Sequence, residues 1–573
     1  MLLRPARPFR SGLACGLALL GLCALAPPRQ EGRRDLGPAV VGKGRQIDDV
    51  LRRFAAFGFS GTVLVGERGT VLLHKGYGLA DRQRGIPNTT AGVFPFASIT
   101  KVFTAAAIYK LEAEGKLSTA DPIGKYLPYV PTAAQRITVL QLLTHSSGIP
   151  HEADNVARGA TPGELVTAIF RVPLQSEPGA RYSYSNAGYD LLTIIVEQVS
   201  GETFESYVRG NLLRPAGLLH TGWRSDFQSR LFPRGYQDMY RDETSEVTFP
   251  PLATGFLVGT AADLYRWSEV LYTDRVLPPT ARTKLFTPAF DEHVNGWLVT
   301  KTKGGVEVQT TDGGYPGYEA TMARFPSRFL TIVLVMNSDA GWPKPVYNTL
   351  RGILLGEEYE PPPLVQAIDE VRLERLSGRY ELPFGATLEA RTADGSLLVD
   401  AAGQEAVSAL AGADAATNLE LIGRNDVATE FVEHLKRGDF DWARSITEFQ
   451  APEPFQRLRN FWHTMTTKKG ALKSFRVVGS SPTRGRGIQT FIRFDLERGS
   501  EYWMLHWWEG KMRGWAIDVS APTPPRFLPI SADEFASLDV PTSRVTRMRF
   551  HREEGELAIP TASGGQVLAR KVN

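Results

Sequence analysis

The sequence predicts an α+β protein of several domains, in which an antiparallel sheet flanked by helices precedes a smaller, β-rich region. The chain has 573 residues, which is too long for one ordinary hydrophobic core. Helical periodicities are mixed with strands joined by short turns, a pattern that favours an antiparallel sheet over a doubly wound one. The run Pro361-Pro362-Pro363 marks the end of a first domain, expected over 44–356.

The first domain carries clear helix and hairpin signals. Residues 60–65 and 71–74 predict two strands of a hairpin around a turn at 67–70. Helices are expected over 102–114 and over 189–199, where Gly201 closes the second one. The first helix is indicated by apolar residues at i, i+3, i+4 and i+7: Ile47, Val50, Leu51 and Phe54. Further strands are predicted over 306–310, 318–325 and 330–336.

Residues 1–26 have the layout of a secretory signal. Arginines precede an apolar run that ends in Ala24-Leu25-Ala26. At about 15 residues, the run is shorter than the roughly 20 that span a bilayer. Pro27 is unfavourable for cleavage, so an uncleaved anchor remains an alternative. We expect a secreted or periplasmic protein with a flexible lead over 27–43, whose membrane contact is limited to an uncleaved N-terminal segment.

Composition narrows the function classes. The net charge is +3 and no long basic run is present, which argues against nucleic acid as the main partner. Both cysteines, Cys15 and Cys23, lie inside the signal, so a cleaved chain would have no disulfide, thiolate metal site or cysteine nucleophile. The sequence has no phosphate-binding loop, H-E-x-x-H or EF-hand pattern. We expect neither a cofactor nor a metal.

Ser98 and Lys101 are candidates for a nucleophile and its base. Ser98 falls at the start of the helix predicted over 102–114, and residues at i and i+3 share a helix face. A serine hydroxyl is a weak nucleophile until a base takes its proton, and a helix N-terminus supplies N–H groups to an oxyanion. S-x-x-K alone occurs roughly once or twice by chance in a chain of this length. Other stretches must therefore support the site.

Two such stretches follow along the chain. Tyr184 and Asn186 precede a predicted helix, where a phenol can relay a proton and an amide can orient a carbonyl. The plainer alternative is a Tyr/Ser-rich turn in which Asn186 caps the helix. The glycines of Thr311-Asp312-Gly313-Gly314 would let substrate approach the backbone, and one N–H could complete an oxyanion hole with that of Ser98. A plain Gly/Pro turn is the alternative there.

In their order along the chain, these stretches resemble the serine β-lactamase and penicillin-binding-protein superfamily. The most similar branch contains class C β-lactamases, D-alanyl-D-alanine carboxypeptidases and related esterases. The resemblance covers roughly residues 44–356 and implies a β-lactamase-like fold. It rests on Ser98-Ile99-Thr100-Lys101, Ile137 to Pro150, Tyr184-Ser185-Asn186 and Gly255 to Leu264.

The resemblance implies an acyl-enzyme route on a small-molecule or peptide-like substrate. Ser98 would attack a carbonyl while Lys101 and Tyr184 move the proton. Asn186 would hold the substrate, and the N–H groups of Ser98 and Gly314 would stabilise the oxyanion. The sequence therefore predicts a serine hydrolase. The alternative is a catalytically weak binding or sensor protein that keeps the same fold.

The third motif departs from the family pattern. Thr311-Asp312-Gly313 stands where the family has Lys-Thr-Gly or His-x-Gly, so a cation is missing and an anion is added. A like charge in a poorly solvated site disfavours a carboxylate ligand. We therefore expect neutral esters or amides to be better substrates than β-lactams or peptide C-termini. A lysine or arginine from elsewhere in the fold could restore the charge.

The C-terminal region reads as one domain inserted into another. After a linker helix expected over 357–371, residues 372–412 and 526–573 resemble the two halves of a small β-barrel-like domain that often follows these hydrolases. Residues 418–520 resemble an NTF2-like cone, with helices against a curved four-stranded sheet. An alternative function for this region is docking a partner at the cell envelope.

His145 and a group of four tryptophans each allow a structural and a functional interpretation. His145 is either a hydrogen-bonded structural histidine or a catalytic one, and no acidic partner is evident to orient it. Four tryptophans of the predicted cone either line a pocket or fill the core face of the sheet: Trp503, Trp507, Trp508 and Trp515.

Overall fold

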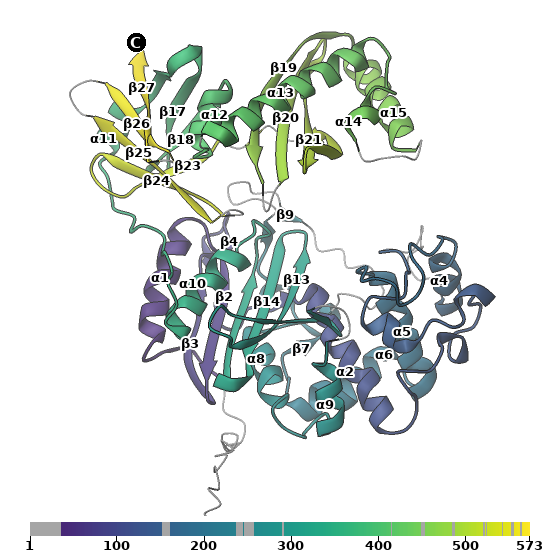
Figure 1. The fold of residues 1–573 in the computed structure, drawn as a ribbon. Helices are drawn as coiled ribbons and strands as arrows, with labels where there is room; N and C mark the ends of the chain where they lie inside the picture. The colour runs from purple at the N-terminus through teal and green to yellow at the C-terminus, as the bar shows by residue number, and fades with distance from the viewer. Residues whose placement is uncertain are drawn as a thin grey trace, which may run out of the picture.

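The structure is a computed structural model of the whole chain (Figure 1). It describes residues 36–151, 161–236, 244–245, 257–288, 292–413, 415–447, 453–483, 487–519, 522, 524–540, 543–551, 555–561 and 564–572. The predicted signal, residues 1–26, lies outside them. Among the described residues, no helix is both long and apolar enough to cross a membrane.

The first domain is built on an antiparallel sheet of eight strands in the order β1-β3-β2-β15-β14-β13-β12-β11. Its strands are β1 (Ala39–Val40), β2 (Gly61–Glu67), β3 (Thr70–Tyr77), β11 (His293–Val294), β12 (Trp297–Lys301), β13 (Glu307–Tyr315), β14 (Tyr318–Phe325) and β15 (Leu330–Met336). The predicted hairpin is β2 and β3, which pair directly. In the middle of this open sheet β2 pairs with β15, so strands from the two ends of the domain's sequence lie side by side.

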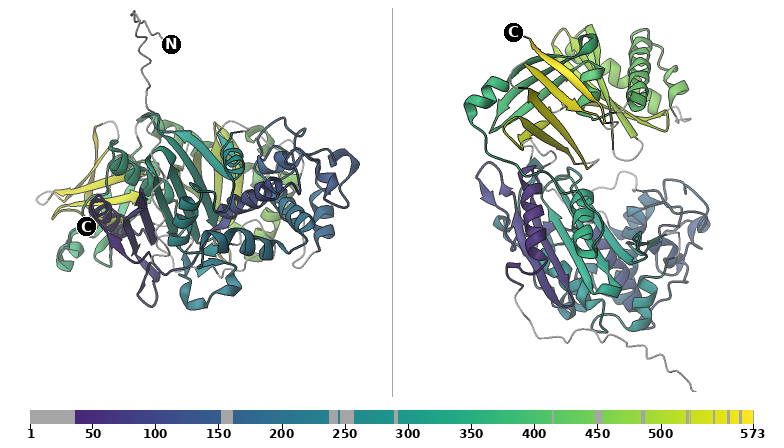
Figure 2. Two further views of the ribbon diagram at one scale, coloured as in Figure 1. Left: turned by 90° about the horizontal axis from the view of Figure 1, so that it is seen from below. Right: turned by 60° about the vertical axis from the view of Figure 1, so that its left-hand side comes forward.

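Helices cover both faces of this sheet (Figures 1 and 2). One face packs on α1 (Gly44–Ala56) and α10 (Pro343–Leu355), and the other on α2 (Thr100–Ala113) and α8 (Ala261–Val270). A hydrophobic cluster lies on each face of the sheet, and side chains alternate along a strand, so β15 contributes to both clusters. Its residues on the face of α1 and α10 are Ile332, Leu334 and Met336, and those on the other face are Val333 and Val335. This explains why every residue of the strand except Thr331 is apolar.

Short elements complete the first domain. The remaining helices are α3 (Val139–Leu143), α4 (Pro162–Ile169), α5 (Asn186–Ser200), α6 (Phe204–Val208), α7 (Arg214–Ala216) and α9 (Pro279–Leu285). The remaining strands are β4 (Leu79–Asp81), β5 (Ile86–Pro87), β6 (Phe94–Pro95), β7 (Thr221–Gly222), β8 (Gly235–Tyr236), β9 (Thr244–Ser245) and β10 (Val258–Gly259).

Helix α5 begins three residues earlier than predicted. Ser185 caps it, because its Oγ accepts a hydrogen bond from the N–H of Gly188 at 2.9 Å. Gly201 ends it in the left-handed conformation, as expected. Asn186 is thus the first helical residue, and the alternative in which it caps the helix is wrong. Its side chain is left to serve another purpose.

The C-terminal region contains a closed barrel of eight strands, interrupted by a second α+β unit. The barrel strands are β16 (Gly378–Glu381), β17 (Thr387–Ala393), β18 (Ser396–Ala402), β23 (Arg526–Pro529), β24 (Glu534–Asp539), β25 (Arg544–His551), β26 (Glu556–Pro560) and β27 (Gln566–Val572). β16 pairs with β27 to close the ring, and β18 pairs with β23. The two sequence segments that were expected to share one β-domain therefore meet in one barrel.

The unit between β18 and β23 has its own hydrophobic core. It comprises α13 (Ala415–Lys436), α14 (Ala443–Ile446), α15 (Glu453–Lys469) and a sheet of β19 (Leu472–Pro482), β20 (Gly487–Leu496), β21 (Gly499–Trp508) and β22 (Lys511–Val519). The preceding helix, α12 (Gln404–Leu410), instead packs into the barrel core through Ala406 and Ala409. Trp503 and Trp507 are buried in the core of the α+β unit, and Trp508 and Trp515 are half-buried. The likeness to an NTF2-like cone stays a prediction.

The segment that joins the two regions is extended where a helix was expected. The predicted linker helix over 357–371 is wrong: residues 357–369 are not helical, and α11 occupies Glu370–Leu376. The Pro361-Pro362-Pro363 run explains this, since proline lacks the N–H that a helix needs and disfavours helical geometry in the residue before it. The barrel nevertheless packs on the first domain, because Leu538 of β24 joins the cluster under α1 and α10.

Candidate active site

Ser98 lies in a tight turn at the entrance to α2. The turn is a single 3-10 segment, Ala97–Ile99, and Ala97 has a φ of +46°, an unusual backbone conformation for a residue with a side chain. Strand β13 presses against this turn: a Cβ added to Gly313 would lie 2.1 Å from the carbonyl oxygen of Phe96 and 3.1 Å from the Ser98 nitrogen. The serine is therefore held between the start of a helix and the backbone of the sheet.

Lys101 is one turn further along and almost fully buried, with 2% of its surface exposed. Its Nζ donates to the Ser98 Oγ at 3.3 Å and to the Asn186 Oδ1 at 2.7 Å. The same ammonium lies over the rings of Tyr184 and Tyr189, 5.0 and 5.6 Å from their centroids. The i, i+3 spacing thus brings the amine to the hydroxyl, as the sequence predicted.

Tyr184 approaches Ser98 from the other side. Its Oη lies 2.8 Å from the Ser98 Oγ, within hydrogen-bond distance. Ser98, Tyr184 and Asn186 are partly exposed, so the hydroxyl at the centre of the group can be reached. The structure therefore brings together the serine, the lysine, the tyrosine and the asparagine that the sequence singled out, from α2 and the start of α5.

The third motif contributes backbone and a neutral hydroxyl. The Thr311 side chain is buried and donates to the carbonyl of Gly296 at 2.9 Å. Gly313 faces the Ser98 turn, whereas a Cβ added to Gly314 would meet nothing within 4 Å. Thr311 is on the same face of β13 as Gly313, because side chains alternate along a strand. Close backbone approach at Gly313 explains why a glycine is needed there.

The sequence predicts that Asp312 places a negative charge in a poorly solvated site. The structure differs: Asp312 is exposed and accepts a hydrogen bond from the Thr321 Oγ1 at 2.6 Å. Because successive residues of a strand point to opposite faces, its side chain is directed away from the face that Thr311 and Gly313 present to Ser98. What distinguishes this motif is the missing cation at position 311.

His145 is buried at the centre of a row of rings. The row alternates imidazole and phenol in the order His293, Tyr182, His145, Tyr184 and His151, with centroids 4.0, 5.8, 4.5 and 5.6 Å apart in turn. Burial, together with the positive charge of Lys101 and the neighbouring imidazoles, lowers the pKa of His145 to about 3. At neutral pH this imidazole is therefore uncharged.

A family comparison bears on these observations. The family model described as Beta-lactamase matches residues 47–355, which is more than half of the chain. The chain belongs to the β-lactamase family. This confirms the predicted resemblance to the serine β-lactamase and penicillin-binding-protein superfamily.

Individual relatives match this β-lactamase-family chain over different lengths. PbpX of Bacillus subtilis is 32% identical over 253 residues, which are 43% of this chain and 63% of that protein, so the chain covers less than two thirds of it. A second Bacillus subtilis protein, named as a penicillin-binding protein, is 27% identical over 386 residues, 60% of this chain and 84% of that protein.

A solved structure extends the likeness to the C-terminal region. The octameric penicillin-binding protein homologue from Pyrococcus abyssi has a TM-score of 0.51 and 18% identity, and the match covers 92% of this chain and all of that one. At this identity the match speaks for the fold alone. It supports the architecture in which a β-lactamase-family domain is followed by further domains.

Sequence reasoning missed several rings around the candidate site. Tyr182 carried a weak signal, two residues before Tyr184 on the same stretch, and His151 follows directly after the 137–150 stretch. His293 carried none, since only the folded sheet brings its strand β11 to the Tyr182 ring. In the part of the chain that the structure describes, no group of three or more His, Cys, Asp or Glu residues could hold a metal ion.

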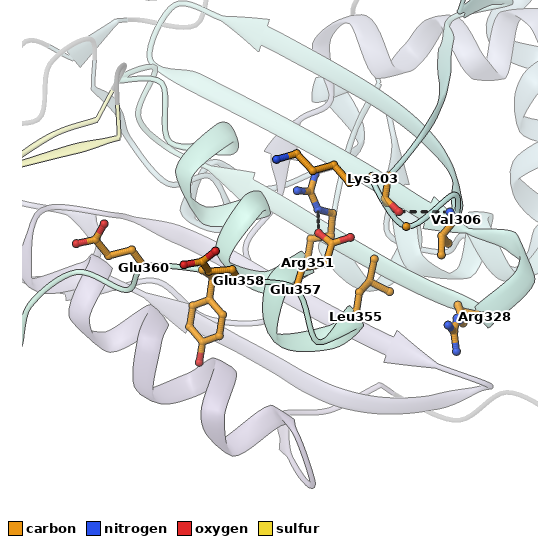
Figure 3. A pocket seen from close by; sticks show the side chains of 11 residues that line it. Lys303, Val306, Arg328, Arg351, Leu355, Glu357, Glu358 and Glu360 are labelled. Carbon is orange, nitrogen blue, oxygen red and sulfur yellow. Dashed lines mark hydrogen bonds and ion pairs between the residues drawn. The ribbon is translucent and has the colours of Figure 1, made fainter.

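A polar pocket of about 830 Å³ lies elsewhere on the first domain (Figure 3). It sits at the end of β13 opposite Gly313, beside the C-terminal end of α10. Acidic and basic side chains mix in it, and Arg351 forms an ion pair with Glu357 at 2.8 Å (Figure 3). No serine or cysteine lines it, so it offers no second candidate for acyl transfer.

Proposed function

We propose that the chain is a serine hydrolase that works through an acyl-enzyme intermediate, with Ser98 as the nucleophile. One observation carries this proposal: the Ser98 Oγ lies 2.8 Å from the Tyr184 Oη and 3.3 Å from the Lys101 Nζ. Two potential proton acceptors within reach of one partly exposed hydroxyl are the arrangement that nucleophilic catalysis by serine needs.

In the proposed reaction, the Ser98 Oγ attacks the carbonyl carbon of the substrate as its proton passes to the Lys101–Tyr184 pair. The N–H groups of Ser98 and Gly314 stabilise the oxyanion that forms. The pair then returns the proton to the leaving alcohol or amine as the carbon–heteroatom bond breaks. A water molecule, deprotonated by the same groups, attacks the acyl-serine ester and releases the acid, which restores Ser98.

Asn186 has two roles in this proposal: it directs the amine of Lys101 and it orients the substrate. Its Oδ1 accepts from Lys101 at 2.7 Å, which directs the amine toward Ser98. Its position as the first residue of α5 fixes the side chain relative to Tyr184, two residues earlier. The side chain also orients the substrate in this proposal, as the family resemblance implies.

We propose a small neutral ester or amide as the substrate, in preference to one that carries a carboxylate. The Thr311 hydroxyl is bonded to the Gly296 carbonyl and offers no positive charge to a carboxylate. Because β-lactams and peptide C-termini carry such a group, this strand gives them no ion pair. Esterase-like activity therefore fits the site better than β-lactam hydrolysis.

Export across a membrane belongs to the same proposal. Its support is the arginine-led apolar segment at residues 1–26, which would place the enzyme in the periplasm or outside the cell. Mass spectrometry of the N-terminus of the protein recovered from cells tests this part. A mature chain that starts near residue 27 is expected, and an intact N-terminus on a cytosolic protein would contradict it.

The catalytic proposal is tested with a fluorophosphonate probe and two substrates. Wild type should become labelled and should hydrolyse a p-nitrophenyl ester faster than nitrocefin, whereas Ser98→Ala should do neither. Ser118→Ala, at a half-buried serine outside the site, is the control and should behave as wild type. Equal labelling of wild type and Ser98→Ala would instead favour the binding or sensor alternative.

A further inference from the structure

His145 is attached to the segment that carries Tyr184 at three points. Its carbonyl oxygen accepts from the N–H of Ser183 at 2.7 Å, and its Nδ1 accepts from the N–H of Ser185 at 3.0 Å. Its ring tilts against the ring of Tyr184 with the centroids 4.5 Å apart. Both neighbours of Tyr184 and the phenol itself are thus held by a single residue.

The backbone of His145 makes this triple attachment possible. It has a φ of +54°, in the left-handed region that residues with side chains seldom adopt. Such a conformation persists only where surrounding contacts stabilise it, and it turns the carbonyl and the imidazole toward the same neighbouring segment. The imidazole also packs on the ring of Tyr189, with the centroids 4.9 Å apart, and meets the ring of Tyr182 edge-on. It is therefore fixed on several sides.

The hydrogen bond from the Ser185 N–H also sets the tautomer of the His145 imidazole. Since Nδ1 accepts from a backbone N–H, the ring proton is assigned to Nε2. Among the described residues, Nε2 has no hydrogen-bond partner. The ring is therefore neutral beside Lys101, and no carboxylate among the described residues is hydrogen-bonded to it as an orienting partner.

We infer that His145 is a positioning residue for the proposed hydrolysis: it holds the Tyr184 hydroxyl against the Ser98 Oγ. The inference rests on the proposed function, because the placement of Tyr184 matters to the rate only if Tyr184 moves a proton. The three attachments described above carry it. His145 acts on the reaction through Tyr184 and does not touch the reacting atoms.

Two substitutions of His145 test the ring contact with Tyr184 and the hydrogen bond from Ser185 separately. His145→Phe keeps a ring against Tyr184 but removes the acceptor for Ser185. His145→Asn keeps an acceptor and tolerates the left-handed backbone but removes the ring. Each variant should lower kcat for a p-nitrophenyl ester by roughly 10-fold to 100-fold, since misplacing a reacting group by about 1 Å can cost 100-fold. KM should change by less than about 3-fold, because ground-state binding is not altered.

A double-mutant cycle with Tyr184→Phe distinguishes positioning from a general loss of structure. If His145 acts through Tyr184, its substitution should lower kcat no further once the phenol hydroxyl is gone. A purely structural effect would instead lower kcat by the same factor in both backgrounds. Such equal factors, or wild-type kcat in both single variants, would overturn the inference.

His74 provides a matched control. It is also a buried histidine, 1% exposed, whose Nδ1 bonds a backbone carbonyl, but it lies on β3 away from Ser98. His74→Asn should leave kcat unchanged in both backgrounds. If His145→Phe does not fold, His145→Asn completes the same cycle. Loss of activity in Ser98→Ala with wild-type kcat in both His145 variants would defeat this inference alone, whereas an inactive wild type would defeat the proposed function.

Discussion

Gly313 packs so tightly on Phe96 that a Cβ added to the glycine would lie 2.1 Å from the Phe96 carbonyl oxygen. The contact joins β13 to the residue two positions before Ser98, and both partners are backbone at that point. Neither can move aside as a side chain could. The distance between the sheet and the Ser98 turn is therefore set by the absence of one methyl group.

Gly313→Ala should push β13 away from the Ser98 turn. We expect kcat/KM for an ester to fall about 100-fold, the loss that a shift of about 1 Å can cause, and the free energy of unfolding to fall by about 1–3 kcal/mol. Denaturant unfolding and steady-state kinetics measure the two effects. Gly514→Ala, a strand glycine whose added Cβ meets nothing within 4 Å, should change neither. A fully active Gly313→Ala would contradict the proposed site.

Lys101 should be irreplaceable by another cation. Lys101→Met keeps the length of the side chain without the amine, and we expect the rate of acylation by a fluorophosphonate to fall by roughly 10²-fold to 10⁴-fold. Lys101→Arg should not restore it, because a guanidinium stays protonated and cannot take the proton of Ser98. Stopped-flow labelling measures both rates. Arginine acting as well as lysine would show that only the charge matters.

Thr311→Lys should return the missing cation of the third motif. The ratio of kcat/KM for nitrocefin to that for a neutral ester should rise about 10-fold, which corresponds to about 1.4 kcal/mol. Thr311→Val removes the same hydroxyl without adding charge and is the control, for which the ratio should stay constant. An unchanged ratio in Thr311→Lys would mean that another group already binds the carboxylate, or that carboxylate binding does not limit turnover.

Glu269 of α8 should make stability fall as pH rises. Burial raises the pKa of its carboxyl to about 7, against the opposing effect of Arg324, and its Oε1 has no hydrogen-bond partner among the described residues. Because this pKa lies above the usual value of 4.5, the folded chain holds the proton more tightly than the unfolded chain. This stabilisation is full below about pH 4.5, and roughly 3 kcal/mol is lost as pH rises from there through 7.

Urea unfolding at pH 5 and pH 8 measures this effect. Glu269→Gln cannot ionise, so its free energy of unfolding should depend less on pH than that of wild type, and the difference between the two proteins should widen at pH 8. Glu358→Gln, at an exposed glutamate, should keep the wild-type dependence. Identical pH curves for Glu269→Gln and wild type would show that Glu269 does not carry the proton.

The parts of the site that depend on local geometry could be predicted from the sequence. Ser98 and Lys101 sit on one helix face because their spacing requires it. Tyr184 and Asn186 were found through the order of motifs along the chain. The direction of Asp312 was not, because strand alternation assigns faces only once the register of β13 is known. His293 reaches Tyr182 only through tertiary packing, which no spacing in the sequence encodes.

The insertion point in the barrel has a consequence for how the chain can change over generations. β18 and β23 are antiparallel neighbours, so the barrel is topologically complete without the 120 or so residues between them, and a turn would serve where a domain now stands. The inserted unit can accordingly be lost, lengthened or exchanged while the strands that close the ring keep their partners. Mutations can therefore change the inserted unit while the fold of the first domain stays the same.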